Sequence, residues 1–70
     1  MVYERLRNLR EDRDYTQQYI ADLLYINRRT YSAYETGVNA LPVEILISLA
    51  KIYNTSTDYL LGLSDNLSIK

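Results

Sequence analysis

The chain has 70 residues, of which 47% are hydrophobic and 24% charged, and its formal net charge is -1. This length allows one small domain with a modest core, and no apolar run is long enough to span a membrane. Cysteine and histidine are both absent, which excludes disulfides and most zinc sites and removes the side chain best suited to proton transfer near pH 7. We therefore expect no metal and no cofactor. The amino terminus, MVYERLRNLR, lacks the apolar segment of a secretory signal, so the cytoplasm is the expected compartment.

The first dozen residues place apolar side chains at helical spacing, with polar residues between them, at Val2, Leu6 and Leu9. They predict an amphipathic helix. A second helix should run from about residue 17 to 24, with Thr16 as its N-cap. Tyr15 lies where it can pack on Ile20 as a hydrophobic staple.

A third helix is predicted to begin only two residues after the second one ends. Asn27 can cap it, and Ile26 can staple onto Tyr31. The helix should end at about Thr36, because Gly37 can adopt the left-handed backbone conformation that follows many helices. Two helices joined by so short a turn are typical of a helix-turn-helix unit.

Two more helices complete the pattern. Pro42 is suited to a helix start, and VEILISLAKIY continues as a mostly apolar fourth helix. Ser56 is the expected cap of a short fifth helix, and Gly62 its terminator. We find no strand alternation or internal repeat, so the sequence predicts an all-α fold of five short helices. Residues 1–70 should form one domain, with a core at about 2–62 and a tail at 63–70.

The third helix leaves one face without apolar side chains if Tyr31 and Tyr34 turn toward the second helix. The exposed face would then carry Arg28, Arg29, Ser32, Ala33 and Thr36. An arginine fork matches the two acceptors of guanine in the major groove, and small neighbours let a helix lie deep in that groove. This pattern favours base reading, although exposed helix faces also carry arginines simply as solvated charges.

The distribution of charge supports a local basic face better than the net charge does. Six of the eight basic residues lie in the first 29 positions, and all six are arginines: Arg5, Arg7, Arg10, Arg13, Arg28 and Arg29. The eight tyrosines could stack on single-stranded nucleic acid, but their largely helical spacing favours core packing. The acidic residues Glu11, Asp12 and Asp14 are the remaining catalytic candidates. A solvated connection is their preferred interpretation, and we expect no enzyme activity.

The segment TQQYIADLLYINRRTYSAYETG, residues 16 to 37, resembles the helix-turn-helix of the Cro and phage-repressor family, also known as the XRE family. The similarity extends from about ERLRNLRED through STDYLLGLS. Matching features include TQ at the start of the second helix, the small Ala21 where the two helices cross, Ile26 in the turn, and YE before Gly37. The resemblance implies a compact lambda-repressor-like domain with its helix-turn-helix formed by the second and third helices.

Members of this family are typically regulators of transcription that bind double-stranded DNA operators as dimers, and the resemblance implies a repressor of this type. By position, the residues that read bases are Arg28, Arg29, Ser32 and Ala33. Those that contact the DNA backbone are Gln17, Asn27, Thr36, Val38 and Asn39. Arg10 and Glu35 correspond to a structural pair that joins the first helix to the end of the third.

The chain departs from the family in several places. Tyr25 stands where the family often has glycine, in a turn that can require a left-handed backbone. Tyr31 and Tyr34 occupy core positions, so a buried hydroxyl should find a hydrogen-bond partner or a route to solvent. Basic residues are sparse after Gly37, which predicts a shallow salt dependence of DNA binding.

An alternative function is an antitoxin-like or other protein-interaction module, in which the same fold binds a regulatory protein partner. Dimerisation is expected from the family and from the small size of the core. Apolar side chains near the end of the chain could supply the dimer surface: Leu60, Leu63, Leu67 and Ile69.

Overall fold

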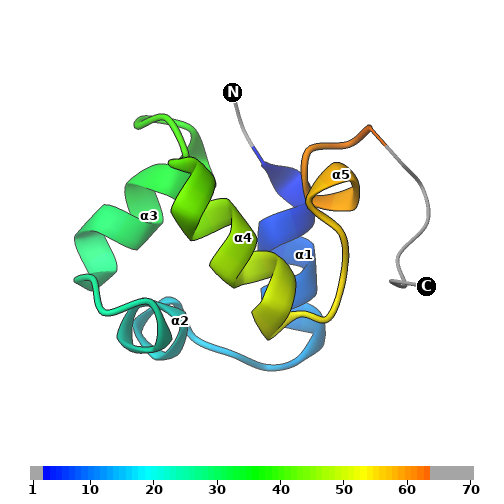
Figure 1. The fold of residues 1–70 in the computed structure, drawn as a ribbon. Helices are drawn as coiled ribbons and strands as arrows, with labels where there is room; N and C mark the ends of the chain where they lie inside the picture. Colours follow the sequence, from blue (N-terminus) through cyan, green and yellow to red (C-terminus); the bar gives the residue numbers. More distant parts are fainter. Residues whose placement is uncertain (1–2, 64–70) are drawn as a thin grey trace.

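A computed structural model of the chain describes residues 3–63, which form five helices and no strand (Figure 1). They are α1 (Glu4–Asp12), α2 (Gln17–Leu23), α3 (Arg28–Thr36), α4 (Val43–Ile52) and α5 (Thr57–Leu60). The prediction of an all-α, five-helix fold is confirmed. Among these described helices, none combines the length and the apolar character needed to cross a membrane. Val2 and most of the predicted tail lie outside the described residues.

Local side-chain caps begin three of the helices, as the sequence predicts. Thr16, Asn27 and Ser56 have extended backbone conformations, and each side chain accepts a hydrogen bond from the backbone N–H three residues later, at 3.0, 2.7 and 3.0 Å respectively. Each cap satisfies a donor that has no partner within its own helix. Pro42 directly precedes α4, with φ at -63°, so its missing N–H leaves no helical bond unmade.

The ends of α3 and α5 also follow the predicted pattern. Gly37 and Gly62 have φ of 83° and 80°, in the left-handed region where glycine carries no steric cost. The end of α2 differs slightly, because Leu24 lies just beyond the helix as its C-terminal cap. Residues 24–27 therefore connect α2 to α3.

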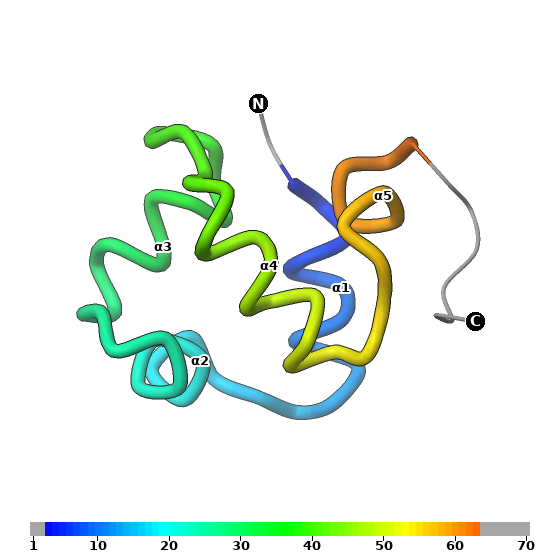
Figure 2. The backbone as a smooth tube through the Cα atoms, in the orientation of Figure 1, coloured from blue at the N-terminus to red at the C-terminus, as the bar shows by residue number. Residues whose placement is uncertain are grey.

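The helices pack around one apolar core. α2 packs against α3, α4 packs against α5, and α1 packs against both α3 and α5. α4 runs across the middle of the view between α3 on one side and α1 and α5 on the other (Figures 1 and 2). Burial of apolar surface from all five helices is the main stabilising contribution. The buried apolar side chains are Leu6, Leu9, Ile20, Ala21, Leu24, Tyr31, Leu46, Leu49, Ala50, Tyr53 and Leu60.

The core includes one residue that was expected on the surface. Leu60 was a candidate for the dimer surface, but only 2% of it is exposed. That expectation is wrong, because the short α5 turns this side chain into the cluster of buried residues from the other helices. Leu63 is exposed, whereas Leu67 and Ile69 lie outside the described residues.

Two arginines of the N-terminal segment are used to join helices. Arg5 donates to the carbonyl oxygen of Tyr59 at 3.0 Å, and its guanidinium carbon lies 4.3 Å from the centre of the Tyr59 ring. Arg13 donates to the carbonyl oxygen of Tyr53 at 3.1 Å and lies 5.3 Å from the centre of that ring. Both combine a hydrogen bond with a cation–π contact. They fasten α1 to α5 and to the end of α4.

Two tyrosines are almost fully buried, which agrees with core packing. The expectation that a buried hydroxyl finds a partner is not met, because the Tyr31 and Tyr53 hydroxyls make no hydrogen bond within the described part of the chain. Burial raises the pKa of Tyr53 to about 12. Burial, together with the nearby Glu35 carboxylate, also raises the pKa of Tyr31. The Tyr53 phenol is thus buried without a hydrogen-bond partner in the described residues, whereas the Tyr31 phenol, although outside hydrogen-bond geometry, is close enough to the Glu35 carboxylate to help lower the pKa of that group.

Candidate nucleic-acid interface

The connection between α2 and α3 has the geometry of a tight turn. The N–H of Tyr25 donates to the carbonyl oxygen of Asp22 at 3.2 Å, and the N–H of Ile26 donates to that of Ala21 at 3.0 Å. Tyr25 has a φ of 59°, so the left-handed conformation expected from the sequence is present. The half-buried Ile26 packs against the core, and Asn27 then caps α3. The start of α3 is therefore fixed relative to α2.

Arg28 and Arg29 lie in the first turn of α3, and both are exposed. Neither makes an ion pair or a side-chain hydrogen bond within residues 3–63. They differ in this respect from Arg10 and Arg13, whose guanidinium groups are held by contacts with other helices. A free guanidinium retains its donors for an external acceptor.

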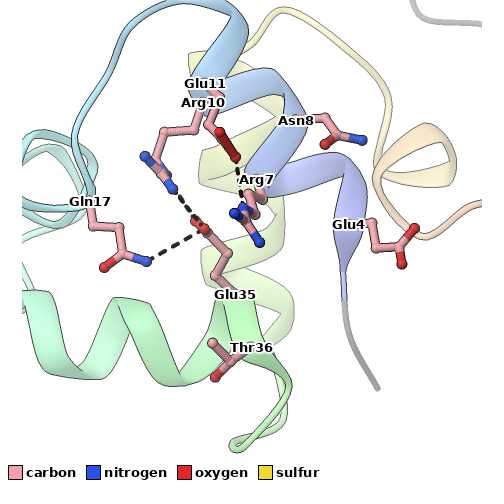
Figure 3. A pocket seen from close by; sticks show the side chains of 8 residues that line it. All are labelled: Glu4, Arg7, Asn8, Arg10, Glu11, Gln17, Glu35 and Thr36. Atoms are coloured by element: carbon pink, nitrogen blue, oxygen red, sulfur yellow. Dashed lines mark hydrogen bonds and ion pairs between the residues drawn. The ribbon is translucent and has the colours of Figure 1, made fainter.

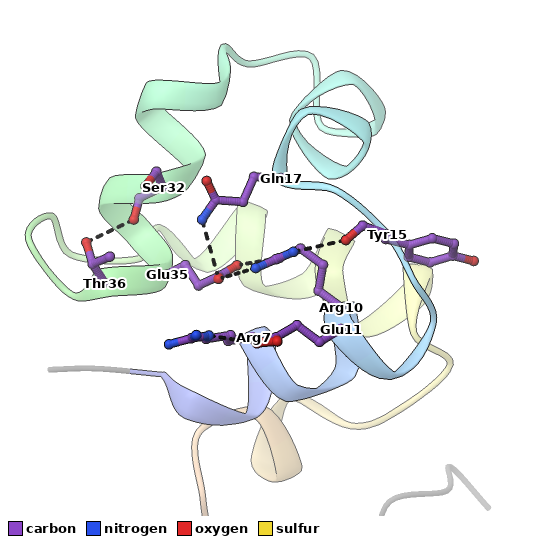
Figure 4. Close-up of polar contacts among 8 residues, drawn as sticks. All are labelled: Arg7, Arg10, Glu11, Tyr15, Gln17, Ser32, Glu35 and Thr36. Carbon is purple, nitrogen blue, oxygen red and sulfur yellow. Dashed lines mark hydrogen bonds and ion pairs between the residues drawn. The ribbon is translucent and has the colours of Figure 1, made fainter.

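The other candidate base-reading residues follow one turn later on α3. Ser32 and Ala33 are half-buried. Thr36, a candidate for contact with the DNA backbone, is exposed on the same face, and its hydroxyl donates to the Ser32 carbonyl oxygen at 2.9 Å (Figure 4). Positions four apart lie on one helix face, so the structure places these small residues beside the two arginines and opposite the buried Tyr31. This face carries two long cationic side chains in the first turn and the short side chains of Ser32 and Ala33 in the next.

The candidate backbone-contacting residues are spread over three segments. Gln17 begins α2 and is half-buried, and its Nε2 donates to Glu35 Oε1 at 3.5 Å. Asn27 uses its Oδ1 as the cap of α3, which leaves its amide nitrogen for an external acceptor. Val38 and Asn39 are exposed in the loop after α3, where the Asn39 N–H donates to the Ala33 carbonyl oxygen at 3.1 Å.

Arg10 and Glu35 form an ion pair with two hydrogen bonds between α1 and the last turn of α3 (Figures 3 and 4). Arg10 Nε lies 3.0 Å from Glu35 Oε2, and Nη2 lies 2.9 Å from Oε1. The third donor, Nη1, reaches the Tyr15 carbonyl oxygen at 3.0 Å, just before α2. One guanidinium therefore holds α1, α3 and the start of the helix-turn-helix in register.

Burial and hydrogen bonding shift the pKa values of Arg10 and Glu35 in opposite directions. Burial alone would raise the pKa of Glu35, but the hydrogen bonds and the charge of Arg10 outweigh it, and the pKa lies below its ordinary value. The hydrogen bond to Glu35 raises the pKa of Arg10. Only 14% of the Arg10 side chain and 4% of the Glu35 side chain are exposed, and their mutual hydrogen bonds and opposite charges keep both charged despite this burial.

An open groove of about 580 Å³ lies beside this pair, between α1, the start of α2 and the end of α3 (Figure 3). Of the α1 residues that line the groove, the sequence analysis selected Arg10 but neither Glu4 nor Asn8, and it did not pair Arg7 with Glu11, although their i, i+4 spacing could have revealed their 2.7 Å ion pair. The lining residues are Glu4, Arg7, Asn8, Arg10, Glu11, Gln17, Glu35 and Thr36. Within residues 3–63, no cluster of acidic side chains could hold a metal ion.

Comparisons with known proteins agree with this geometry. The profile of the helix-turn-helix family matches residues 6–60. The chain is 42% identical over 62 residues to the HTH-type transcriptional regulator AnsR of Bacillus subtilis, which covers 89% of this chain and 53% of that protein. It is 39% identical over 67 residues to the HTH-type transcriptional regulator ImmR of the same organism, which covers 96% and 52% respectively.

A phage-derived protein is also similar. The chain is 36% identical over 53 residues to the cryptic phage CTXphi transcriptional repressor RstR of Vibrio cholerae, which covers 76% of this chain and 48% of that protein. No solved structure gives a significant match. The chain thus spans about half the length of the curated relatives it matches.

Proposed function

Because this chain belongs to the XRE-type helix-turn-helix family, we propose that it is a sequence-specific regulator of transcription that binds double-stranded DNA through α3. The observation that carries this proposal is the pair of exposed arginines in the first turn of α3, which make no ion pair or side-chain hydrogen bond within residues 3–63. The matched relatives are named as transcriptional regulators and not as enzymes, and RstR is named as a repressor. We infer repression for this chain as well, by occupation of an operator.

Base reading is assigned to one face of α3. Arg28 and Arg29 project from the end of the helix that enters the major groove first, and each guanidinium can donate two parallel hydrogen bonds to a guanine. Ser32 and Ala33, one turn later, leave room for close approach and add short contacts to neighbouring bases. This division gives the arginines most of the discrimination between operators.

Phosphate contacts are assigned to residues around this face. The start of α2 and the start of α3 carry partial positive charge, which favours phosphates near Gln17 and Asn27. Thr36 and Asn39 offer polar side chains at the other end of α3, and Val38 can contribute only through its main chain or an apolar contact. Since none of these residues is charged, they position the helix without adding to the salt dependence.

We further propose that two copies bind one operator. Helices that read the same face of the duplex must be separated by about one turn, roughly 34 to 36 Å, which predicts two inverted half-sites. Two domains of this size together supply the contact area that specific DNA binding needs, whereas one α3 face reads only a few base pairs. Repression then follows from exclusive occupation of the operator.

The test is selection of binding sites from a random double-stranded DNA pool near 0.15 M salt, where non-specific electrostatic binding is partly screened. The proposal predicts enrichment of inverted half-sites about 10 base pairs apart, with guanines opposite the arginines. Absence of any enriched sequence, together with a stable protein complex formed through the α3 face, would instead support the protein-interaction module.

A further inference from the structure

Tyr25 combines two properties that no contact within the described residues explains. The residue is 96% exposed, and its side chain makes no hydrogen bond there. Its φ of 59° is in the left-handed region, which is sterically unfavourable for a bulky residue and ordinarily favours glycine. Asp14 and Asn54 also have positive φ, but short polar side chains tolerate this conformation better. The tyrosine therefore has a backbone cost and no visible compensation within the monomer.

The position of Tyr25 is fixed with respect to the proposed DNA-reading face. Its own N–H and that of Ile26 are both bonded to carbonyls of α2, and Asn27 caps α3 directly afterward. The turn lies at the start of α3 in Figures 1 and 2, on the opposite side of the view from the connection between α4 and α5. The backbone of Tyr25 is thus fixed close to the first turn of α3.

The chemistry of this location suits a phosphate. When the first turn of a recognition helix lies in the major groove, a residue just outside that turn lies toward the groove edge, where the sugar-phosphate backbone runs. Asp22, the acidic residue of α2, lies three residues before Tyr25. Its carboxylate accepts a hydrogen bond at 2.8 Å from Gln18, which lies one helical turn farther from the connection. Tyrosine hydroxyls are among the groups that donate to phosphate oxygens.

We propose that the Tyr25 hydroxyl donates a hydrogen bond to a backbone phosphate at the edge of the operator half-site and thereby fixes the register of α3 in the groove. This inference rests on the proposed function. It also accounts for the strained conformation, which persists because it aims the side chain at the DNA. A phosphate contact carries no base preference, so its loss weakens binding to related operators by the same factor.

The experiment compares full-length variants on two duplexes: the operator selected from the random pool, and the same duplex with one half-site base pair changed. Tyr25→Phe removes only the hydroxyl, and Tyr25→Gly removes the side chain and the backbone strain. Tyr59→Phe removes a hydroxyl from α5, on a different part of the surface. Asn54→Gly makes the corresponding glycine replacement at the other uncharged residue with positive φ.

We expect Tyr25→Phe to bind both duplexes roughly ten- to a hundredfold more weakly, as loss of one hydrogen bond to a charged acceptor implies. Tyr25→Gly should bind at least as weakly, yet unfold at a higher urea concentration than the wild type, because glycine relieves the strain. The two control variants should bind as the wild type does. Weaker binding by Tyr25→Phe, which keeps the aromatic ring and the backbone conformation, would assign the effect to the hydroxyl and not to the shape of the turn.

The outcomes separate the two proposals. If Arg28→Ala loses operator binding while Tyr25→Phe binds as the wild type does, the hydroxyl contact is overturned and the DNA-binding function stands. A wild-type protein that selects no DNA sequence overturns both proposals. In that case, a protein complex weakened by Tyr25→Gly would assign the exposed ring to a protein interface instead.

Discussion

Arg10 and Glu35, 25 residues apart in the sequence, hold α1 against the last turn of α3 through two hydrogen bonds of 3.0 and 2.9 Å. Their side chains are almost entirely shielded from water. Such a pair stabilises orientation more surely than it stabilises the fold, because desolvation of both charges offsets much of their attraction. Removal of one partner alone is strongly destabilising, because the charge of the other partner then remains buried without compensation.

Replacement of Glu35 by glutamine should therefore be strongly destabilising. The uncompensated Arg10 guanidinium should lower the free energy of unfolding by about 3 to 5 kcal/mol, measured by urea denaturation at pH 7. Glu11→Gln is the matched control, because the Arg7–Glu11 side chains are 67% and 51% exposed. An exposed pair of this kind contributes little, so the control should remain close to the wild type. Equal effects of the two substitutions would contradict the structural role of Glu35.

The same pair predicts a specific acid sensitivity. The pKa of Glu35 lies below its ordinary value of 4.5, so folding favours the ionised carboxylate. The resulting stabilisation is fully present above the unfolded-state pKa and is lost as pH falls through the lower folded-state pKa. The difference in unfolding free energy between the wild type and Glu35→Gln should narrow below about pH 4.5. Parallel curves between pH 6 and pH 2 in urea titrations would show that Glu35 does not supply this dependence.

Arg28→Ala and Arg29→Ala should separate DNA binding from folding. Each substitution should weaken binding to the selected operator by about 1 to 3 kcal/mol, because one bidentate base contact is lost. The free energy of unfolding should stay near the wild-type value, since neither side chain has a partner in the described structure. Lys51→Ala, which removes an exposed charge from α4, is the control. Binding measured by fluorescence anisotropy that is unchanged in both arginine variants would refute the assignment.

Asn27 has a structural role and a proposed DNA-binding role, and two substitutions distinguish them. Asn27→Ala removes the cap oxygen that accepts the Thr30 N–H, and should cost about 0.5 to 2 kcal/mol of stability. Asn27→Asp retains a good cap but places a negative charge where we propose a phosphate. It should unfold like the wild type and bind the operator less tightly. If Asn27→Asp binds normally, Asn27 serves only as the cap.

The sequence predicted the parts of this fold whose signals are local. A capping side chain accepts its hydrogen bond from the backbone N–H three residues later. The starts of α2, α3 and α5 could therefore be identified from Thr16, Asn27 and Ser56. The left-handed conformation of Gly37 is also a short-range signal, whereas that of Tyr25 was expected only from the family resemblance. The family resemblance supplied the longer-range expectation that Arg10 meets Glu35, a contact that composition and helical spacing alone do not reveal.

The features that escaped prediction depend on how the helices meet. Arg5 and Arg13 could have belonged to a basic surface, but they bond to carbonyls 54 and 40 residues away. Gln17 was expected to face DNA alone, whereas it also reaches Glu35. Leu60 lies in the core because α5 rotates it inward, and a four-residue helix has too little periodicity to indicate its buried face. Each outcome requires the tertiary arrangement.

Arg5, Arg10 and Arg13 join helices, whereas Arg28 and Arg29 make no such contact within residues 3–63. This difference has an evolutionary consequence. Changes to the arginines that hold α1 to the other helices would disturb how the helices pack, whereas no ion pair or side-chain hydrogen bond within residues 3–63 depends on the two arginines in the first turn of α3. Under the proposed function, mutation at positions 28 and 29 would therefore change the operator sequence that is bound at little risk to folding. The same two positions are the natural starting points for a library that redirects the protein to a chosen promoter.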